Sequence, residues 1–498
     1  MPSQVKTGAI LSYLGLGINV LIGLLYTPWM INTIGRDNYG LYTLAMSVIS
    51  LFVFDFGLSS AVSRFVAKYI AEGHPEKAND CLGIVYRIYI ILDVLILIVL
   101  SSVYFFIPQI YESLTPQEID SFRVIYIIVS VFSLVSFPMI PLNGILIANE
   151  KFIQLKICEL VNKVFIVITM SICLILGFGL YALVSVNVAA GLLMICLKLL
   201  FVKKYTSTRI NFLYHNRLEQ RSIIHFSTWV TIISLCQRMI FNIAPSILGI
   251  MSGAASIAIL GIAITIEGYV YTFSSALSGL FLPKVSRIML SGQLEILPLM
   301  IRVGRIQVMI IGAIILCFAL FGQEFIYLWT GPYFSASYLC AIFLIIPAFI
   351  HLPQEIASTA ISVGNKVKHQ ALVFICMALT NIALAFWFAK FWGATGIAFS
   401  ICIAYLVRTI GMNIIYHKML RIDIRNFFIK TYCKYILPAI IIISIGIFFN
   451  LLLNDWDWVT LVLKVFLLGI SILLCYWFCY MTDSEKNIIT SIIKWRKK

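Results

Sequence analysis

Four ionisable side chains lie deep inside long uncharged stretches of the sequence. Asp55 interrupts a run over residues 38–63 that is otherwise uncharged, and Asp93, Glu267 and Arg238 lie in similar runs. A charge at the centre of a bilayer costs about 2.5–3.5 kcal/mol or more when nothing pairs with it, so such residues are candidates for function. Carboxylates at this depth can bind H⁺ or Na⁺, and an arginine can bind an anionic group.

The elements that carry these residues must be membrane-spanning helices. Of the 498 residues, 61% are hydrophobic and 11% are charged, and the mean hydropathy is +1.00. Soluble domains carry about 25% charged residues, whereas apolar runs of about 20 residues, enough to cross a bilayer, recur along this chain. Runs this long and continuous exclude barrel strands. The sequence therefore predicts an all-α polytopic membrane protein.

About fourteen transmembrane helices are predicted, with both termini in the cytoplasm. The basic residues behind the net charge of +15 fall in alternate loops, as the positive-inside rule expects, which argues against nucleic-acid binding. The predicted spans are residues 7–33, 39–64, 81–108, 122–148, 157–177, 180–202, 223–250, 254–282, 297–321, 338–363, 371–391, 394–416, 433–453 and 459–480.

An internal repeat relates the two halves of the chain. Four features recur with offsets between 215 and 217 residues, and the matched residues are Pro28 with Pro245, Pro138 with Pro353, Asn149 with Asn365, and Gly179 with Gly396. Each repeat holds six spans, an even number, so both halves have the same orientation, and a substrate site is expected between them near the midplane. The matched prolines fit helices that bend during alternating access, and they fit static kinks equally well.

The repeat sets the predicted domain boundaries. They are an N-terminal six-helix lobe over 1–205, a C-terminal six-helix lobe over 206–430, an extra helix pair over 431–482 and a basic tail over 483–498. The repeat offset places Glu267 over Leu51, one helical turn from Asp55, so both halves present a carboxylate on equivalent faces. Arg238 lies near the middle of the seventh span, with Asn242 one turn later on the same face.

Structural ion pairs are the alternative interpretation of these charges. Arg238 can pair with Glu267, and for Arg87 and Asp93 a structural pair is the favoured interpretation. His351 and Glu355, four residues apart, are expected to form a hydrogen-bonded structural pair rather than a proton-titratable one. The basic residues nearer the cytoplasmic side are expected to snorkel, with binding of anionic head groups as a secondary role for the first four: Arg64, Lys68, Arg302, Arg305, Lys163, Lys198 and Arg408.

Enzyme motifs are absent from the sequence. It contains no Walker A motif and no metal-ligand spacing among its 12 cysteines and 6 histidines. The longest outer loops, near residues 109–121 and 322–337, are too short for a catalytic domain, and the outer loops hold mainly acids, among them Glu324. We therefore expect a protein that is not an enzyme and that has no cofactor or metal, apart from H⁺ or Na⁺ as a coupling ion.

The N-terminal region resembles that of a transporter family. A Gly-Arg-x-x-Tyr-Gly-Leu-Tyr turn at residues 35–42, a Phe-Gly-Leu-Ser-Ser segment at 56–60 and the basic residue Arg64 follow one another. These motifs resemble the polysaccharide flippases, the O-antigen and capsule repeat-unit translocases of the multidrug/oligosaccharidyl-lipid/polysaccharide (MOP) exporter superfamily.

This resemblance implies two six-helix lobes around a central cavity lined by helices 1, 2, 7 and 8, in the cytoplasmic (inner) membrane of a bacterium. It implies an undecaprenyl-pyrophosphate-linked oligosaccharide as substrate, and an extra helix pair that forms a groove for the lipid tail. Arg238, Asn242 and Arg64 are then the expected cavity residues for the substrate. Asp55, Glu267 and Asp93 are the expected residues for ion coupling or charge pairing.

Three other functions remain open at this point. The first is a cation-coupled multidrug exporter of the same fold, although such exporters usually have twelve spans. The second is a membrane glycan polymerase or ligase, which the short outer loops disfavour. The third is a scaffold in a glycan-assembly complex. Membrane lipids, a glycan polymerase and chain-length machinery are the expected partners of a flippase.

Overall fold

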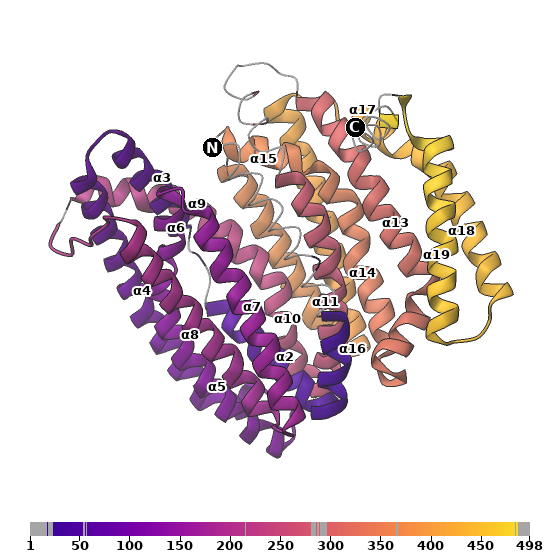
Figure 1. Ribbon diagram of the computed structural model, residues 1–498, viewed down its shortest axis with the longest axis horizontal. Helices are drawn as coiled ribbons and strands as arrows, with labels where there is room; N and C mark the ends of the chain where they lie inside the picture. Colours follow the sequence, from indigo (N-terminus) through magenta and orange to yellow (C-terminus); the bar gives the residue numbers. More distant parts are fainter. Residues whose placement is uncertain are drawn as a thin grey trace. The chain divides into compact units, whose positions relative to one another are not determined.

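The computed structural model describes residues 17, 23–52, 55, 57–214, 216–279, 285, 288, 296–364, 367–483, 485 and 486. In this part of the chain every regular element is a helix, and eleven helices are long and apolar enough to cross a membrane (Figure 1). The predicted all-α polytopic class is confirmed. One of the eleven, α16 (Val367–Leu420), contains two predicted spans, which meet at the non-helical residue Gly393.

The described chain forms two compact units, Met1–Gly261 with Ala371–Ala404, and Ile262–Gln370 with Tyr405–Lys498. These units differ from the predicted lobes, whose arrangement stays a prediction. The first unit contains a helix over residues 23–34, α2 (Arg36–Phe52), α3 (Leu58–Ala71), α4 (Pro75–Ile110), α5 (Pro116–Ser136), α6 (Pro141–Ala148), α7 (Phe152–Ile175), α8 (Leu180–Tyr205), α9 (Arg217–Asn242) and α10 (Ala244–Met251).

The second unit contains α13 (Ile296–Thr330), α14 (Ala336–His351), α15 (Glu355–Val363), α17 (Ile424–Phe428), α18 (Lys434–Leu452) and α19 (Trp458–Cys475). Two helices, α11 (Gly253–Gly279) and α16, continue from one unit into the other. Two π-helical turns, η4 (Ile429–Cys433) and η5 (Tyr476–Tyr480), precede α18 and follow α19.

The predicted span 39–64 is interrupted, which corrects one expectation. α2 ends at Phe52 and α3 begins at Leu58, with Gly57 in the left-handed conformation at φ 68°. A glycine adopts this conformation without the steric cost that a Cβ would add. Asp55 therefore lies in a break between two helices and not in the middle of one. The predicted span 7–33 falls largely outside the described residues.

Two of the repeat-matched prolines have the same local structure. Pro138 lies in the short 3₁₀ turn η1 (Phe137–Met139) between α5 and α6, and Pro353 lies in the turn η3 (Leu352–Gln354) between α14 and α15. Proline lacks the N–H that a continuous helix needs, so a tighter turn at the same place in each repeat follows from the sequence. The other pair differs, because Pro245 lies in the first turn of α10 while Pro28 lies within a helix. Of the matched loop residues, Asn365 lies outside the described residues.

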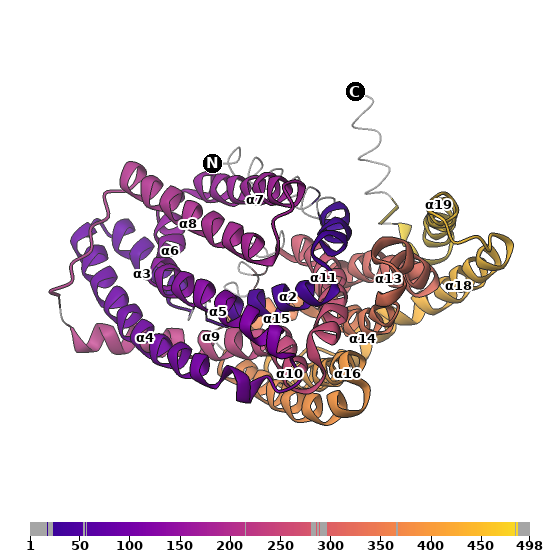
Figure 2. The same cartoon turned by 90° about the horizontal axis from the view of Figure 1, so that it is seen from below.

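The C-terminal helices pack against α13. A buried cluster joins Val308 and Phe321 of α13 with Tyr435 of α18 and with Leu468 and Ile472 of α19. Figures 1 and 2 both show α18 and α19 beside α13. The extra helix pair predicted from the sequence is thus attached to the second unit mainly through this one helix.

Candidate functional site

Asp55 caps the helix that follows the break in the first unit. Its Oδ1 accepts a hydrogen bond from the backbone N–H of Ser59, 3.0 Å away, and one from the hydroxyl of Tyr89, 3.4 Å away. The first N–H groups of a helix have no partner within the helix, and a carboxylate there is favoured by the helix dipole. The carboxylate therefore has a structural role at the start of α3.

The side chain of Arg238, a residue of α9, binds the end of α2 on the other side of the same break. Its Nη1 donates to the carbonyl of Ser50 in the last turn of α2, with 2.8 Å between the two atoms. The last carbonyls of a helix lack internal partners and favour a cation. Arg238 also interacts electrostatically with Asp55. The break in the chain is thus held by an anion at one helix end and a cation at the other.

The remaining candidates of the first unit do not form the pair that the sequence suggested. Arg87 donates to the backbone carbonyl of Tyr214, and in the described part of the chain no ion pair joins it to Asp93. The buried Oδ1 of Asp93 finds no hydrogen-bond partner there. Asn242 is half-buried at the last position of α9, and Arg64 is exposed in α3.

Glu267 is the most buried acid among the candidates. It is 8% exposed in α11, and within the described residues no hydrogen bond or ion pair joins it to another group. The side chains of Tyr271 and Tyr405 lie near it. A buried carboxylate without a partner carries a large desolvation cost, so it favours a bound proton or cation.

A second polar group lies around Tyr405 in the same unit. Nδ1 of His351 donates to the carbonyl of Pro347 at 2.9 Å, and its ring stacks on Tyr405 with 5.0 Å between centroids. Within the residues that the structure describes, the expected hydrogen bond between His351 and Glu355 is not formed. The guanidinium of Arg408 lies 5.9 Å from the Tyr405 ring centre and is buried, so the snorkelling expected for it is wrong.

Metal ligands do not gather in the structure. Among the residues that the structure describes, no three His, Cys, Asp or Glu side chains lie close enough to hold a metal ion.

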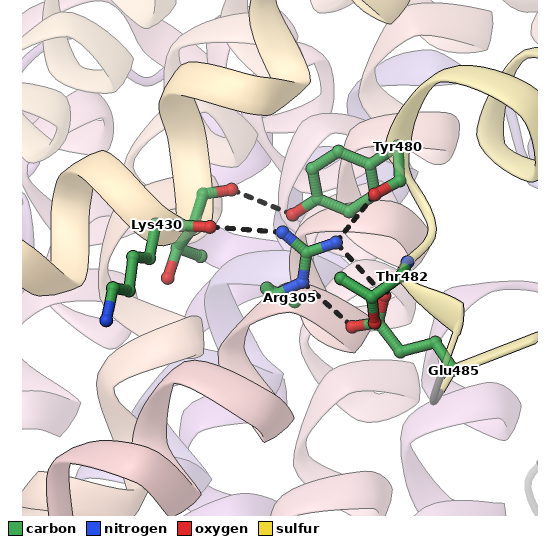
Figure 3. A network of polar contacts seen from close by, with 6 residues as sticks. Arg305, Lys430, Tyr480, Thr482 and Glu485 are labelled. Atoms are coloured by element: carbon green, nitrogen blue, oxygen red, sulfur yellow. Dashed lines mark hydrogen bonds and ion pairs between the residues drawn. The ribbon is translucent and has the colours of Figure 1, made fainter.

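Arg305 forms a buried network instead of snorkelling, which corrects a further expectation. Its Nε and Nη2 donate to the two carboxylate oxygens of Glu485 at 2.8 and 3.0 Å, and both residues are buried. Nη1 and Nη2 also donate to the backbone carbonyls of Lys430 and Tyr480 at 3.1 and 2.7 Å. Figure 3 shows the guanidinium enclosed by these groups. Both carbonyls belong to the π-helical turns η4 and η5.

A second buried ion pair lies near the opposite end of α13. Nζ of Lys464 in α19 is 2.7 Å from Oε2 of Glu324 in α13 and 3.3 Å from Oδ1 of Asn450 in α18. Lys464 is 0% exposed and Glu324 3%. The placement of Glu324 in an outer loop is thus wrong. Lys464 was missed, although a lysine within an apolar run is itself a signal for a functional or paired charge.

An apolar groove runs between α13 and α19. Its volume is about 740 Å³, and every residue that lines it is apolar, among them Phe318, Phe321, Phe325, Leu461, Val465 and Phe466. Its lining extends from Ala313 to Phe325 on α13 and from Leu461 to Leu473 on α19. About twelve residues of helix rise about 18 Å, more than half of a hydrocarbon layer about 30 Å thick. The groove therefore fits a long apolar chain.

Comparison with known proteins gives three kinds of relative. The sequence profile of the polysaccharide biosynthesis protein family matches residues 5–290. The uncharacterized membrane protein EpsK of Bacillus subtilis (strain 168) is 21% identical over 385 residues, which are 74% of each chain. Among solved structures, the lipid II flippase MurJ in an inward closed conformation has a TM-score of 0.68 at 13% identity, covering 94% of this chain and 98% of MurJ.

A multidrug transporter has the same fold. The MATE multidrug transporter DinF-BH has a TM-score of 0.65 at 16% identity, covering 86% of this chain and 97% of that one. The family and the folds are those of membrane transporters and flippases and not of enzymes. The chain therefore belongs to the polysaccharide biosynthesis protein family, and it has the fold of the lipid II flippase MurJ and of MATE transporters of the MOP superfamily.

Proposed function

We propose that this protein moves undecaprenyl-pyrophosphate-linked oligosaccharide repeat units from the inner to the outer leaflet of a bacterial cytoplasmic membrane by alternating access. Both termini are cytoplasmic in this proposal. A glycan polymerase and its chain-length machinery would then receive the substrate on the outer side. The O-antigen and capsule pathways are the proposed settings, because the sequence motifs at residues 35–42 and 56–60 resemble their translocases.

The apolar groove between α13 and α19 is the observation that carries the proposal. A polyisoprenoid tail has no polar groups, so it can leave lipid and pack against this surface through dispersion contacts without losing any hydrogen bond. An organic cation would gain little from such a surface, since it has a charge to neutralise. The groove thus favours a lipid-linked substrate over the multidrug-exporter alternative, even though some structures of the same fold are drug transporters.

Arg238 is the proposed contact for the pyrophosphate. A planar guanidinium binds phosphate oxygens through two parallel hydrogen bonds, and it does so more specifically than an ammonium group. In the structure Arg238 is engaged by Ser50 and attracted by Asp55. An arriving pyrophosphate would therefore compete with the carbonyl of Ser50 for the guanidinium. Asn242 and Arg64 are the further proposed substrate contacts.

Blocking the groove tests the proposal. Gly469 lines the groove, and a Cβ added there meets open space. Gly469→Phe should therefore fold while filling the groove, and Gly469→Ala is the matched control. In a flippase-null strain, surface glycan per unit of membrane protein should fall with Gly469→Phe and stay normal with Gly469→Ala. Normal glycan with well-inserted Gly469→Phe would contradict a tail in this groove.

Glu267 is the proposed site of a coupling ion. Its carboxylate is 8% exposed and has no described hydrogen-bond partner. Burying it with a bound H⁺ or Na⁺ costs less free energy than burying it as an uncompensated negative charge. Glu267→Gln mimics the protonated state. We expect it to leave protein abundance unchanged and to abolish the dependence of translocation on a proton or sodium gradient in proteoliposomes. An unchanged gradient dependence would place coupling elsewhere, with Asp55 and Asp93 as the remaining candidates.

A further inference from the structure

The attachment of α18 and α19 to the rest of the second unit depends mainly on one neighbouring helix. Apart from each other and the turns η4 and η5, they pack mainly against α13. A helix pair held by one neighbour in lipid has little hydrophobic driving force to keep it in place, because lipid tails are as apolar as its own side chains. Specific polar contacts are then the natural means of fixing it.

Two such contacts lie at opposite ends of α13. Arg305 binds Glu485 and the carbonyls of Lys430 and Tyr480, which joins α13 to the beginning of α18 and the end of α19 (Figure 3). Near the other end, Glu324 binds Lys464 of α19, whose amine also reaches Asn450 of α18. Arg305 and Glu324 are 19 residues apart, which corresponds to about 28 Å along a helix and to the thickness of the hydrocarbon layer.

We propose that these two buried ion pairs clamp α18 and α19 to α13 as one rigid body, so that the groove between α13 and α19 keeps its shape throughout the transport cycle. Arg305, Glu485, Glu324 and Lys464 are then positioning residues for the groove. The role of the groove rests on the proposed function, but the rigidity of the three helices does not depend on it.

The chemistry of the pairs fits this role better than a role in stability alone. Buried ion pairs often add little net stability over apolar residues of the same size, and their best-attested use is to fix one arrangement against alternatives. Each ion pair joins residues from more than one helix. The pair of Arg305 is bidentate, which fixes the relative orientation of the two charged groups as well as their distance. The carbonyls that accept from Arg305 come from π-helical turns, which are rare and are frequently found at functional sites.

A disulfide between α13 and α18 tests the proposal. A Cβ added at Gly446 would lie 3.2 Å from Cγ of Leu320, so Leu320→Cys with Gly446→Cys is compatible with the short Cβ separation of a disulfide. In a background without the 12 native cysteines, all of them free in the structure, oxidation should join the two positions without loss of translocation. A loss on oxidation that a reductant restores would overturn the proposal, as would a failure of the purified protein to form the bond.

Spin-label distances give a second measurement that needs no substrate. Labels at Ile310 of α13 and Ile447 of α18, both at exposed positions, report on the two helices, and labels at Ile310 and Tyr327 within α13 are the matched rigid control. We expect the first distance distribution to be as narrow as the control in detergent and in lipid, with or without lipid-linked glycan. A second distance for Ile310 and Ile447 in any of these states would overturn the proposal. Because this readout is independent of transport, a wrong assignment of substrate would not affect it.

Discussion

Asp55 and Arg238 hold the two helix ends that meet at the break between α2 and α3. Arg238 donates to the carbonyl of Ser50 at the end of α2, and Asp55 accepts from the backbone N–H of Ser59 at the start of α3. The two charges also attract each other. Each charge therefore complements the dipole of the helix end that it binds. A broken helix with charged groups at its ends is the arrangement on which transporters build ion and substrate sites.

The role of Asp55 as a cap predicts different effects for two substitutions. Asp55→Asn keeps an oxygen that can accept from Ser59, so the protein should reach the membrane in normal amounts and unfold at nearly the wild-type temperature. Asp55→Ala removes the acceptor and should cost about 1 kcal/mol of stability. Thermal unfolding of the purified variants in detergent measures both.

A translocation assay distinguishes the structural role of Asp55 from a role in ion coupling or substrate binding. If its charge also serves coupling or holds Arg238 ready for substrate, Asp55→Asn should lose export at normal abundance. Full export by this variant would leave Asp55 with the capping role alone.

Arg238 should be more tolerant of lysine than of alanine. Arg238→Lys keeps a cation that can bind the last carbonyls of α2 and one phosphate oxygen, so we expect part of the transport to remain. Arg238→Ala loses a charged hydrogen bond worth about 1.5–3 kcal/mol and should lower transport roughly tenfold or more. Surface glycan in a flippase-null strain, normalised to membrane protein, is the measurement. If Arg238→Ala loses protein abundance and transport in equal proportion, Arg238 is only a helix-end partner.

Hydropathy predicted most of the fold because each membrane helix must satisfy its own backbone. Spans such as 157–177 and 180–202 differ from α7 and α8 by only a few residues at each end. The break at Asp55 was not predicted, since hydropathy averages over about 20 residues and the left-handed Gly57 is a single-residue event. The sequence did carry a signal there, because Asp55 and Gly57 belong to the residue types that are favoured at helix starts.

The buried ion pairs could not be predicted in the same way. Arg305 and Glu485 are 180 residues apart, and Lys464 and Glu324 are 140 apart. Nothing in a single sequence states which distant charges meet. Arg305 lies near a predicted cytoplasmic end of its span, where snorkelling is the common outcome, and only packing decides whether water or another helix covers the guanidinium. For the same reason the spacing of His351 and Glu355 suggested a pair that the described part of the chain does not contain.

The carboxyl group of Glu485 should make the stability of the second unit depend on pH. Burial by itself would raise its pKa, but the hydrogen bonds from Arg305 and from the backbone and hydroxyl of Thr482 lower the pKa below the usual value. A group with a lowered pKa stabilises the folded state fully above the pKa it has when unfolded, about 4.3, and this stabilisation is lost as the pH falls through the folded value.

Thermal unfolding of wild type and Glu485→Gln at a series of pH values measures this contribution. Between about pH 5 and 7 wild type should unfold at a higher temperature than the variant. The difference should correspond to a loss of unfolding free energy on the order of 3 kcal/mol in the variant. The difference should shrink below about pH 4. A difference that stays constant down to about pH 3 would mean that Glu485 acts through packing and not through its charge.

Lys464 and Glu324 should show strong coupling in a double-mutant cycle. Lys464→Met leaves the carboxylate of Glu324 buried without its cation, and one oxygen of that carboxylate already lacks a hydrogen-bond partner in the described part of the chain. Removing one partner of a buried pair costs about 3–5 kcal/mol. Glu324→Leu alone strands the ammonium group and should cost a similar amount, although Asn450 still accepts one hydrogen bond from it.

The double variant Lys464→Met/Glu324→Leu decides between a stabilising and a positioning role. Apolar residues of similar volume next to Phe321 and Leu461 should restore the unfolding temperature close to wild type, because no charge remains buried. If the pair positions the groove, this stable double variant should still translocate less than wild type, and its α13–α18 spin-label distances should broaden. Wild-type transport and narrow distances in the double variant would show that packing alone holds the helix pair. Restored stability with impaired transport is the result that we expect.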